Sequence, residues 1–157
     1  TIELPSPVFG DWYSKRDFPV FRMPEMYLIA AEAALLGSSG GGSSAAFPYI
    51  EDLANARAID GDGAVLLASY GVTGAGDIDL DFILDERARE FIGENLRWFD
   101  LKRTMKLEER VMTHNIMARP HFNTDIHYLR PIPSILIEAS INKSDTVGVG
   151  MWQNYGY

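Results

Sequence analysis

Residues 22–36 read RMPEMYLIAAEAALL and contain the longest apolar run of the chain, Met26 to Ala31. The stretch predicts a helix, with Pro24 in its first turn, where a missing backbone N–H costs nothing. Gly37 follows as a natural C-cap. Because apolar residues cover nearly all of its circumference, we expect this helix to be buried on more than one side. The apolar run is far shorter than the roughly 20 residues that a membrane-spanning helix needs.

A helical hairpin is predicted over residues 23–58. Its second helix extends from about Phe47 to Ala58, and residues 38–44 are rich in Gly and Ser, which is typical of a short flexible turn. Two helices joined by a short Gly-rich loop form an antiparallel pair. Two such helices are too few for a repeat array that stands alone, so we expect a partner or further chain to complete the core.

A long third helix is predicted over residues 79–110, after a loop rich in Gly and Asp at residues 59–78. Asp77 or Asp79 is the expected N-cap of this helix. Gly93 lies inside it, where glycine costs about 1 kcal/mol relative to alanine. We interpret this glycine as a sign that another backbone approaches closely.

The two ends of the chain are predicted to be irregular. Prolines and a glycine interrupt the lead-in at residues 1–22. In the C-terminal part, residues 111–157, the proline pair of residues 131–133 forbids a helix across its segment. Ser134 is a candidate cap for a short helix over residues 135–139. The predicted fold class is therefore mainly α, with loop-rich segments.

Composition and charge exclude several functional classes. The 157 residues are 46% hydrophobic and carry a formal net charge of −8. That composition is enough for a core, but it lacks the clustered cations that nucleic acid or an anionic membrane demands. The chain has no cysteine, which excludes disulfides, thiolate metal sites and a thiol nucleophile. It also has no P-loop, dinucleotide fingerprint or nucleophile elbow, so we expect no cofactor.

The sequence predicts no metal site. His114, His121 and His127 are spaced seven and six residues apart, which fits no zinc pattern. Residues 77–82 read DIDLDF and begin like an EF-hand loop, but phenylalanine stands where glycine is required. Helix capping and a turn explain these aspartates better.

Charged residues occupy unexpected positions on the predicted helices. Glu86, Glu90 and Glu94 follow one another at i, i+4 and i+8, a spacing at which like charges destabilise an isolated helix. Buried carboxylates need cations or hydrogen bonds. We therefore predict a structural ion-pair network between packed helices. Its members are Arg22, Glu25, Glu32, Arg57, Glu86, Arg87, Glu90, Glu94 and Arg97.

The alternative for these glutamates is a catalytic pair for glycoside hydrolysis, in which two carboxyl groups flank a cleft. A general acid needs an environment that raises its pKa, whereas neighbouring arginines lower the pKa of a carboxyl group. The sequence places an arginine at helical spacing from each glutamate. We therefore favour the structural network and expect no enzymatic activity.

Six segments resemble motifs of the SusD/RagB-like family, and they occur in the order that the family shows. The segments are residues 22–33 (RMPEMYLIAAEA), 53–58 (LANARA), 83–91 (ILDERAREF), 93–103 (GENLRWFDLKR), 131–133 (PIP) and 153–157 (QNYGY). Pro24 replaces an alanine of the family pattern, and Tyr155 replaces a proline. Family members are several times longer, so this chain resembles the C-terminal portion.

The resemblance implies TPR-like helix hairpins and a non-catalytic lipoprotein of Bacteroidetes for polysaccharide utilisation. Such proteins lie on the outer-membrane surface, bind a glycan or another nutrient, and pass it to a TonB-dependent SusC-like transporter. The implied partners are a glycan or oligosaccharide, the transporter and the remaining N-terminal part of the same protein. The lipid anchor is expected in a segment absent from this chain.

Trp12 and Tyr13 are the candidate ligand-binding residues. They are adjacent aromatic residues in an irregular segment, and aromatic rings stack on pyranose faces. Packing against the helices is the alternative for this pair, and Trp98 is predicted to be a core residue. The alternative function is a helical-hairpin scaffold that binds protein without binding glycan.

Overall fold

The computed structural model describes residues 20–37, 40–140 and 153–154 of the chain. The regular elements within these residues are all helices, and none of the described residues forms a strand. The predicted mainly α fold is therefore confirmed. The chain divides into two compact units, residues 1–87 and residues 88–157.

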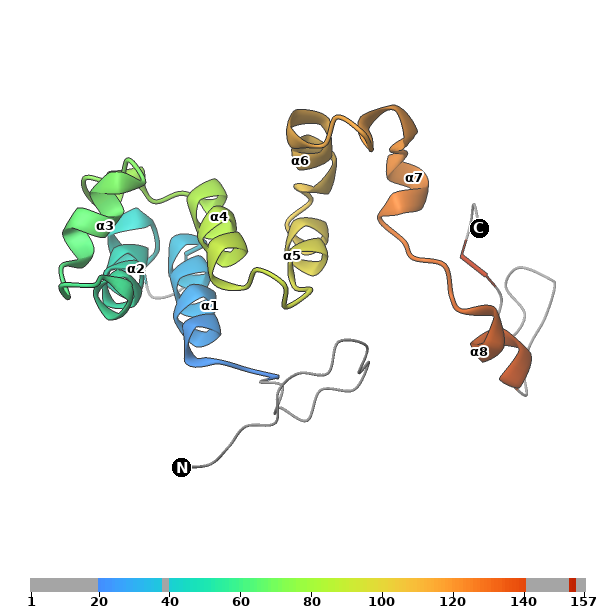
Figure 1. Cartoon of the computed structure of the whole chain (residues 1–157), viewed down its shortest axis with the longest axis horizontal. Helices are drawn as coiled ribbons and strands as arrows, with labels where there is room; N and C mark the ends of the chain where they lie inside the picture. Colours follow the sequence, from blue (N-terminus) through green and yellow to red (C-terminus); the bar gives the residue numbers. More distant parts are fainter. Residues whose placement is uncertain (1–19, 38–39, 141–152, 155–157) are drawn as a thin grey trace, which may run out of the picture. The chain divides into compact units, whose positions relative to one another are not determined.

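The first unit begins with two contacting helices, α1 (Met23–Leu35) and α2 (Ser43–Arg57) (Figure 1). Gly37 has a φ of +111° and donates its N–H to the carbonyl of Ala34. This left-handed conformation favours glycine and ends α1 as predicted. The second helix starts earlier than expected, at Ser43, whose hydroxyl donates to the carbonyl of Ile78 at 2.8 Å.

One face of α1 lies in the core of the first unit. The buried apolar residues of this unit are Leu28, Ala31, Ala34, Ala46, Ile50, Leu53, Ala54, Leu67, Val72, Ile78, Ile83 and Leu84. Several alanines among them allow α1 and α2 to lie close together. The other face of α1 is exposed at Met26 and Ile29, and the C-cap residue Leu36 is exposed as well. Within the described residues α1 is therefore buried on one side, and its burial on a second side stays a prediction.

The segment predicted as a loop at residues 59–78 contains two helical elements, α3 (Gly63–Ser69) and the 3-10 helix η2 (Ala75–Asp77). Asp62 caps α3, because its carboxylate accepts the N–H groups of Ala64 and Val65 at 3.1 and 3.2 Å. Sequence reading missed α3 because it is short and is flanked by Gly and Asp, which usually mark loops.

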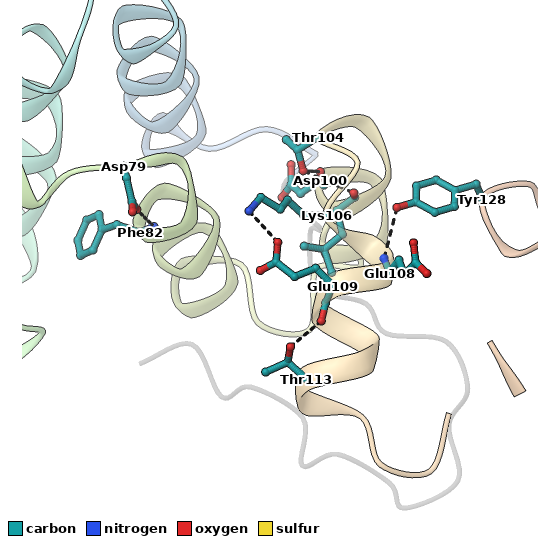
Figure 2. Close-up of polar contacts among 10 residues, drawn as sticks. Asp79, Phe82, Asp100, Thr104, Lys106, Glu108, Glu109, Thr113 and Tyr128 are labelled. Atoms are coloured by element: carbon teal, nitrogen blue, oxygen red, sulfur yellow. Dashed lines mark hydrogen bonds and ion pairs between the residues drawn. The ribbon is translucent and has the colours of Figure 1, made fainter. Parts of the chain in front are cut away.

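The two candidate caps of the third predicted helix have different roles. Asp79 accepts the N–H of Phe82 at 2.7 Å and caps the helix, as predicted for this residue (Figure 2). Asp77 instead accepts the backbone N–H of Thr73 at 2.8 Å and the Thr73 hydroxyl at 2.9 Å. These bonds, the backbone one first, hold the pKa of Asp77 below the ordinary value of an aspartate.

The prediction of one long helix over residues 79–110 is wrong. Three helices occupy the region: α4 (Leu80–Glu90), α5 (Arg97–Arg103) and α6 (Leu107–His114). Left-handed residues separate them, namely Gly93 (φ +83°), Asn95 (φ +62°) and Met105 (φ +57°). Glu94 consequently lies outside α4 and does not continue the row of Glu86 and Glu90.

Gly93 serves a backbone conformation rather than a close contact, contrary to the sequence interpretation. A Cβ atom added there would meet no atom within 4 Å. We expect Gly93→Ala to lower the free energy of unfolding by about 1 kcal/mol, because an L-residue is strained at this φ. Urea unfolding followed by circular dichroism measures the change. Gly76→Ala is the matched control, since Gly76 has open space and no left-handed φ; equal losses in the two variants would contradict the explanation.

The second unit contains α5 and α6, which are in contact, and three short elements. These are the 3-10 helix η3 (Arg119–His121), α7 (Thr124–His127) and α8 (Ser134–Ala139). Tyr128 links the region after α7 to the start of α6, because its hydroxyl accepts the N–H of Glu108 at 3.3 Å (Figure 2). The predicted irregular C-terminal part thus holds more helix than expected.

The short helix predicted over residues 135–139 is present as α8, but Ser134 is not its cap. Pro133 occupies the N-cap position, and no side chain caps the helix. Among the described residues, every helix is too short or too polar to cross a membrane.

Candidate functional site

Two adjacent aromatic residues on α5 form the most distinctive surface of the second unit. The rings of Trp98 and Phe99 lie edge to face, with centroids 5.3 Å apart and an interplanar angle of 86°. Phe99 is 54% exposed, and Trp98 is half-buried. Trp98 is therefore not the core residue that the sequence predicted, and Phe99 presents an open aromatic surface.

Two cations lie over the Trp98 ring. The Arg130 guanidinium carbon is 4.2 Å from the ring centroid, and the Lys102 ammonium is 4.9 Å from it. Arg130 also lies 5.5 Å from the centroid of Phe99. Both distances to Trp98 are within the range of a cation–π interaction. We call Trp98, Phe99, Lys102 and Arg130 the Trp98 cluster.

The geometry of α5 explains why Lys102 lies over Trp98. Lys102 follows Trp98 by four residues, so the two side chains share one face of the helix. Arg103 lies next to Lys102 but forms an ion pair with the buried Asp100 at 3.1 Å. Lys102 and Arg130 differ from Arg103, because neither forms an ion pair or a side-chain hydrogen bond within the described part of the chain.

The segment that carries Arg130 is held by two residues near the C-terminus. Ile132 lies between two prolines, which have no backbone N–H, so Ile132 provides the N–H donor of this tripeptide. Gln153 accepts this N–H at 2.6 Å and donates its own amide to the Ile132 carbonyl at 2.8 Å. Asn154 donates to the Arg130 carbonyl at 2.6 Å. The backbone of Arg130 is thus fixed from outside its own segment.

The sequence-predicted ligand residues Trp12 and Tyr13 lie outside the described residues, so their role stays a prediction. The Trp98 cluster was missed because Arg130 is distant from α5 in the sequence. The sequence signal that could have indicated this cluster was the high density of aromatic and basic residues in residues 97–103, RWFDLKR.

One contact of the predicted ion-pair network is visible in the first unit. The Arg87 guanidinium Nη2 lies 3.8 Å from the Glu25 carboxylate, and these side chains are 4% and 13% exposed. Glu32, seven residues after Glu25 on α1, is also buried. The remaining members of the network have interactions of their own, and their pairing stays a prediction.

The three histidines do not form a common site. His127 Nδ1 accepts the N–H of Asn123 at 2.8 Å, and its ring stacks on Phe122 with centroids 5.3 Å apart. This histidine therefore stabilises the start of α7. Within the described residues, no group of three His, Asp or Glu side chains is placed to hold a metal ion.

Comparison with known proteins gives a consistent result. Residues 8–157 match the SusD family. The chain is also similar to SusD-like protein P2 of Formosa agariphila, with 34% identity over 121 residues. That match covers 76% of this chain and 23% of the relative, so the chain spans about a quarter of the relative's length. No solved structure matches the chain.

Proposed function

The chain belongs to the SusD family, and we propose from this membership that it is part of a non-catalytic nutrient-binding protein on the bacterial outer-membrane surface. In this proposal the protein binds a glycan or another nutrient and passes it to a TonB-dependent SusC-like transporter. The observation that carries the proposal is the family match over residues 8–157. A lipid on a segment outside this chain provides the anchor.

The charged residues support binding rather than hydrolysis. A glycosidase needs two carboxyl groups on either side of the scissile bond. Glu86, Glu90 and Glu94 each interact with other groups of the protein, and the end of α4 at Glu90 separates Glu94 from the other two. A structural role for these glutamates agrees with a protein that binds its nutrient without cleaving it.

An apolar stripe on α1 supports the expectation that the remaining N-terminal part packs against this chain. Met26 and Ile29 are spaced three residues apart and share a face of α1, and Leu36 follows as the C-cap residue directly after the helix. All three are exposed, by 46%, 48% and 69%. The matched relative is about four times as long as the part this chain covers. We propose that a helix of the N-terminal part covers this stripe in a TPR-like array.

The proposal is tested by calorimetric titration of a glycan panel into this chain and into the longer protein. We expect a glycan to bind the longer protein. Binding by this chain alone that Trp12→Ala weakens by about fivefold would place a site on the predicted aromatic pair, because stacking on an aromatic ring contributes about 1 kcal/mol. Trp152→Ala is the matched control, because the family resemblance predicts a packing role rather than a binding role for this second tryptophan.

Two results would contradict the proposal. The first is a failure of both proteins to bind any glycan or other nutrient, together with specific capture of a helical peptide on the α1 stripe, which would favour the protein-binding scaffold. The second is glycan hydrolysis that Glu90→Gln abolishes without loss of folding. That result would assign the glutamates to catalysis.

A further inference from the structure

We propose that the Trp98 cluster is a binding site for an acidic sugar, namely a pyranose ring that carries a carboxylate. The inference rests on the proposed function, because it takes a glycan as the ligand. It adds the location of a site on α5 and the chemical class of the sugar.

The two cations of the cluster provide the recognition of an anion. Arg130 and Lys102 lie 4.2 and 4.9 Å from the centroid of the same ring, so both cations contact one side chain. Within the described residues, neither cation has a carboxylate partner. A bound carboxylate would therefore supply the counter-charge that both cations lack within these residues. An arginine fork matches the two oxygens of a carboxylate.

The aromatic residues provide a surface for the sugar ring. Phe99 is more than half exposed, and Arg130 lies 5.5 Å from its centroid. The C–H groups of a pyranose ring carry a slight positive charge, which the negative face of an aromatic ring attracts. An acidic sugar combines both features, because its carboxylate reaches the cations while its ring contacts Phe99.

The backbone around Arg130 is positioned before a ligand arrives. Gln153 forms a pair of hydrogen bonds with Ile132, and Asn154 holds the Arg130 carbonyl. These bonds fix the segment without the Arg130 side chain. The Arg130 guanidinium is therefore not needed to attach the segment, and its charge can serve a ligand. A pre-positioned site loses less conformational entropy on binding.

The test uses the 157-residue chain, with tetragalacturonate as the acidic probe and its methyl ester as the neutral analogue. The indole N–H signal of Trp98, identified by its loss in Trp98→Phe, is followed by NMR during each titration. We expect tetragalacturonate to shift this signal and the methyl ester to leave it in place. Added NaCl should weaken binding, because the recognition is ionic.

Substitutions distinguish the contribution of the two cations to binding from the effect of the net charge of the chain. Lys102→Gln and Arg130→Gln should each raise the Kd for tetragalacturonate about tenfold, as expected when a charged hydrogen bond is lost. Arg130→Lys should give an intermediate Kd, since it keeps the charge and loses the fork. Lys106→Gln is the matched control, because Lys106 is paired with Glu109 at 2.8 Å outside the cluster. It should leave the Kd unchanged.

Each remaining outcome has a defined meaning. An unshifted Trp98 signal, equal binding of the methyl ester, or an equal loss in Lys106→Gln would overturn the inference. If Arg130→Gln unfolds, the Kd measured for Lys102→Gln tests the inference, because Lys102 lies on α5 and outside the segment that carries Arg130. Binding of neutral glycans without binding of tetragalacturonate overturns the acidic site and supports the proposed function. Failure of every glycan to bind this chain overturns the inference alone, whereas failure of the longer protein as well to bind any glycan or other nutrient overturns both.

Discussion

Replacement of Arg87 by methionine is expected to lower the free energy of unfolding by about 3–5 kcal/mol, the range seen when one partner of a buried ion pair is removed. Arg87 is 4% exposed on α4, and its Nη2 atom lies 3.8 Å from the carboxylate of Glu25, which is 13% exposed. Methionine fills a similar volume but leaves a carboxylate without this cation where water has little access. Urea unfolding with linear extrapolation measures the change.

Arg89→Met is the matched control, because it removes the same charge from the exposed face of the same helix. We expect it to change the free energy of unfolding by at most about 1 kcal/mol. The double variant Glu25→Leu with Arg87→Met should regain part of the loss, since no buried charge of the pair remains. Equal losses in Arg87→Met and Arg89→Met would show that burial of the pair contributes nothing.

Replacement of Gly63 by alanine is expected to lower the free energy of unfolding by about 1–3 kcal/mol, as overpacking does. Gly63 begins α3 at a point where it touches α2. Its N–H donates to the Asn55 side-chain oxygen at 2.8 Å. An added Cβ would lie 2.5 Å from that oxygen and 2.6 Å from the Asn55 backbone nitrogen. The backbone of α2 or α3 must therefore move.

The control for Gly63→Ala is Gly74→Ala, because Gly74 has extended backbone and open space around the added atom. Asn55→Ala separates the hydrogen bond from the steric effect and should cost about 0.5–1.5 kcal/mol. Circular dichroism during urea unfolding reports all three variants. A Gly63→Ala protein as stable as Gly74→Ala would mean that α3 tolerates a greater distance from α2.

Part of the fold follows from local sequence signals. The helix α1 was predicted from its apolar run, its early proline and Gly37, and Asp79 was predicted as a cap of α4. These signals act within one or two turns, so they operate in any tertiary context. The division of residues 79–110 into α4, α5 and α6 was not predicted. Asn95 and Met105 adopt left-handed φ values although neither is glycine, and the surrounding sequence continues a helical pattern.

The candidate site shows the same division. The sequence pointed to Trp12 and Tyr13 as ligand residues and assigned Trp98 to the core. Trp98 is instead half-buried beneath two cations, because the segment carrying Arg130 returns to α5. The spacing of residues within α5 shows that Lys102 shares a helix face with Trp98. The sequence of α5 does not show that Arg130 reaches the same ring.

By itself, the sequence determined the mainly α class, the position of α1, the end of α2, and, through six motifs in order, the family. These properties depend on hydrophobic spacing, capping and motif order, which are all local or ordinal features of the chain. The tertiary structure alone decided that α3 docks on α2 through Gly63 and Asn55, that Arg87 meets Glu25, and that Arg130 lies over Trp98. Each of these contacts joins different segments, and its energy exists only after the chain has brought the segments together.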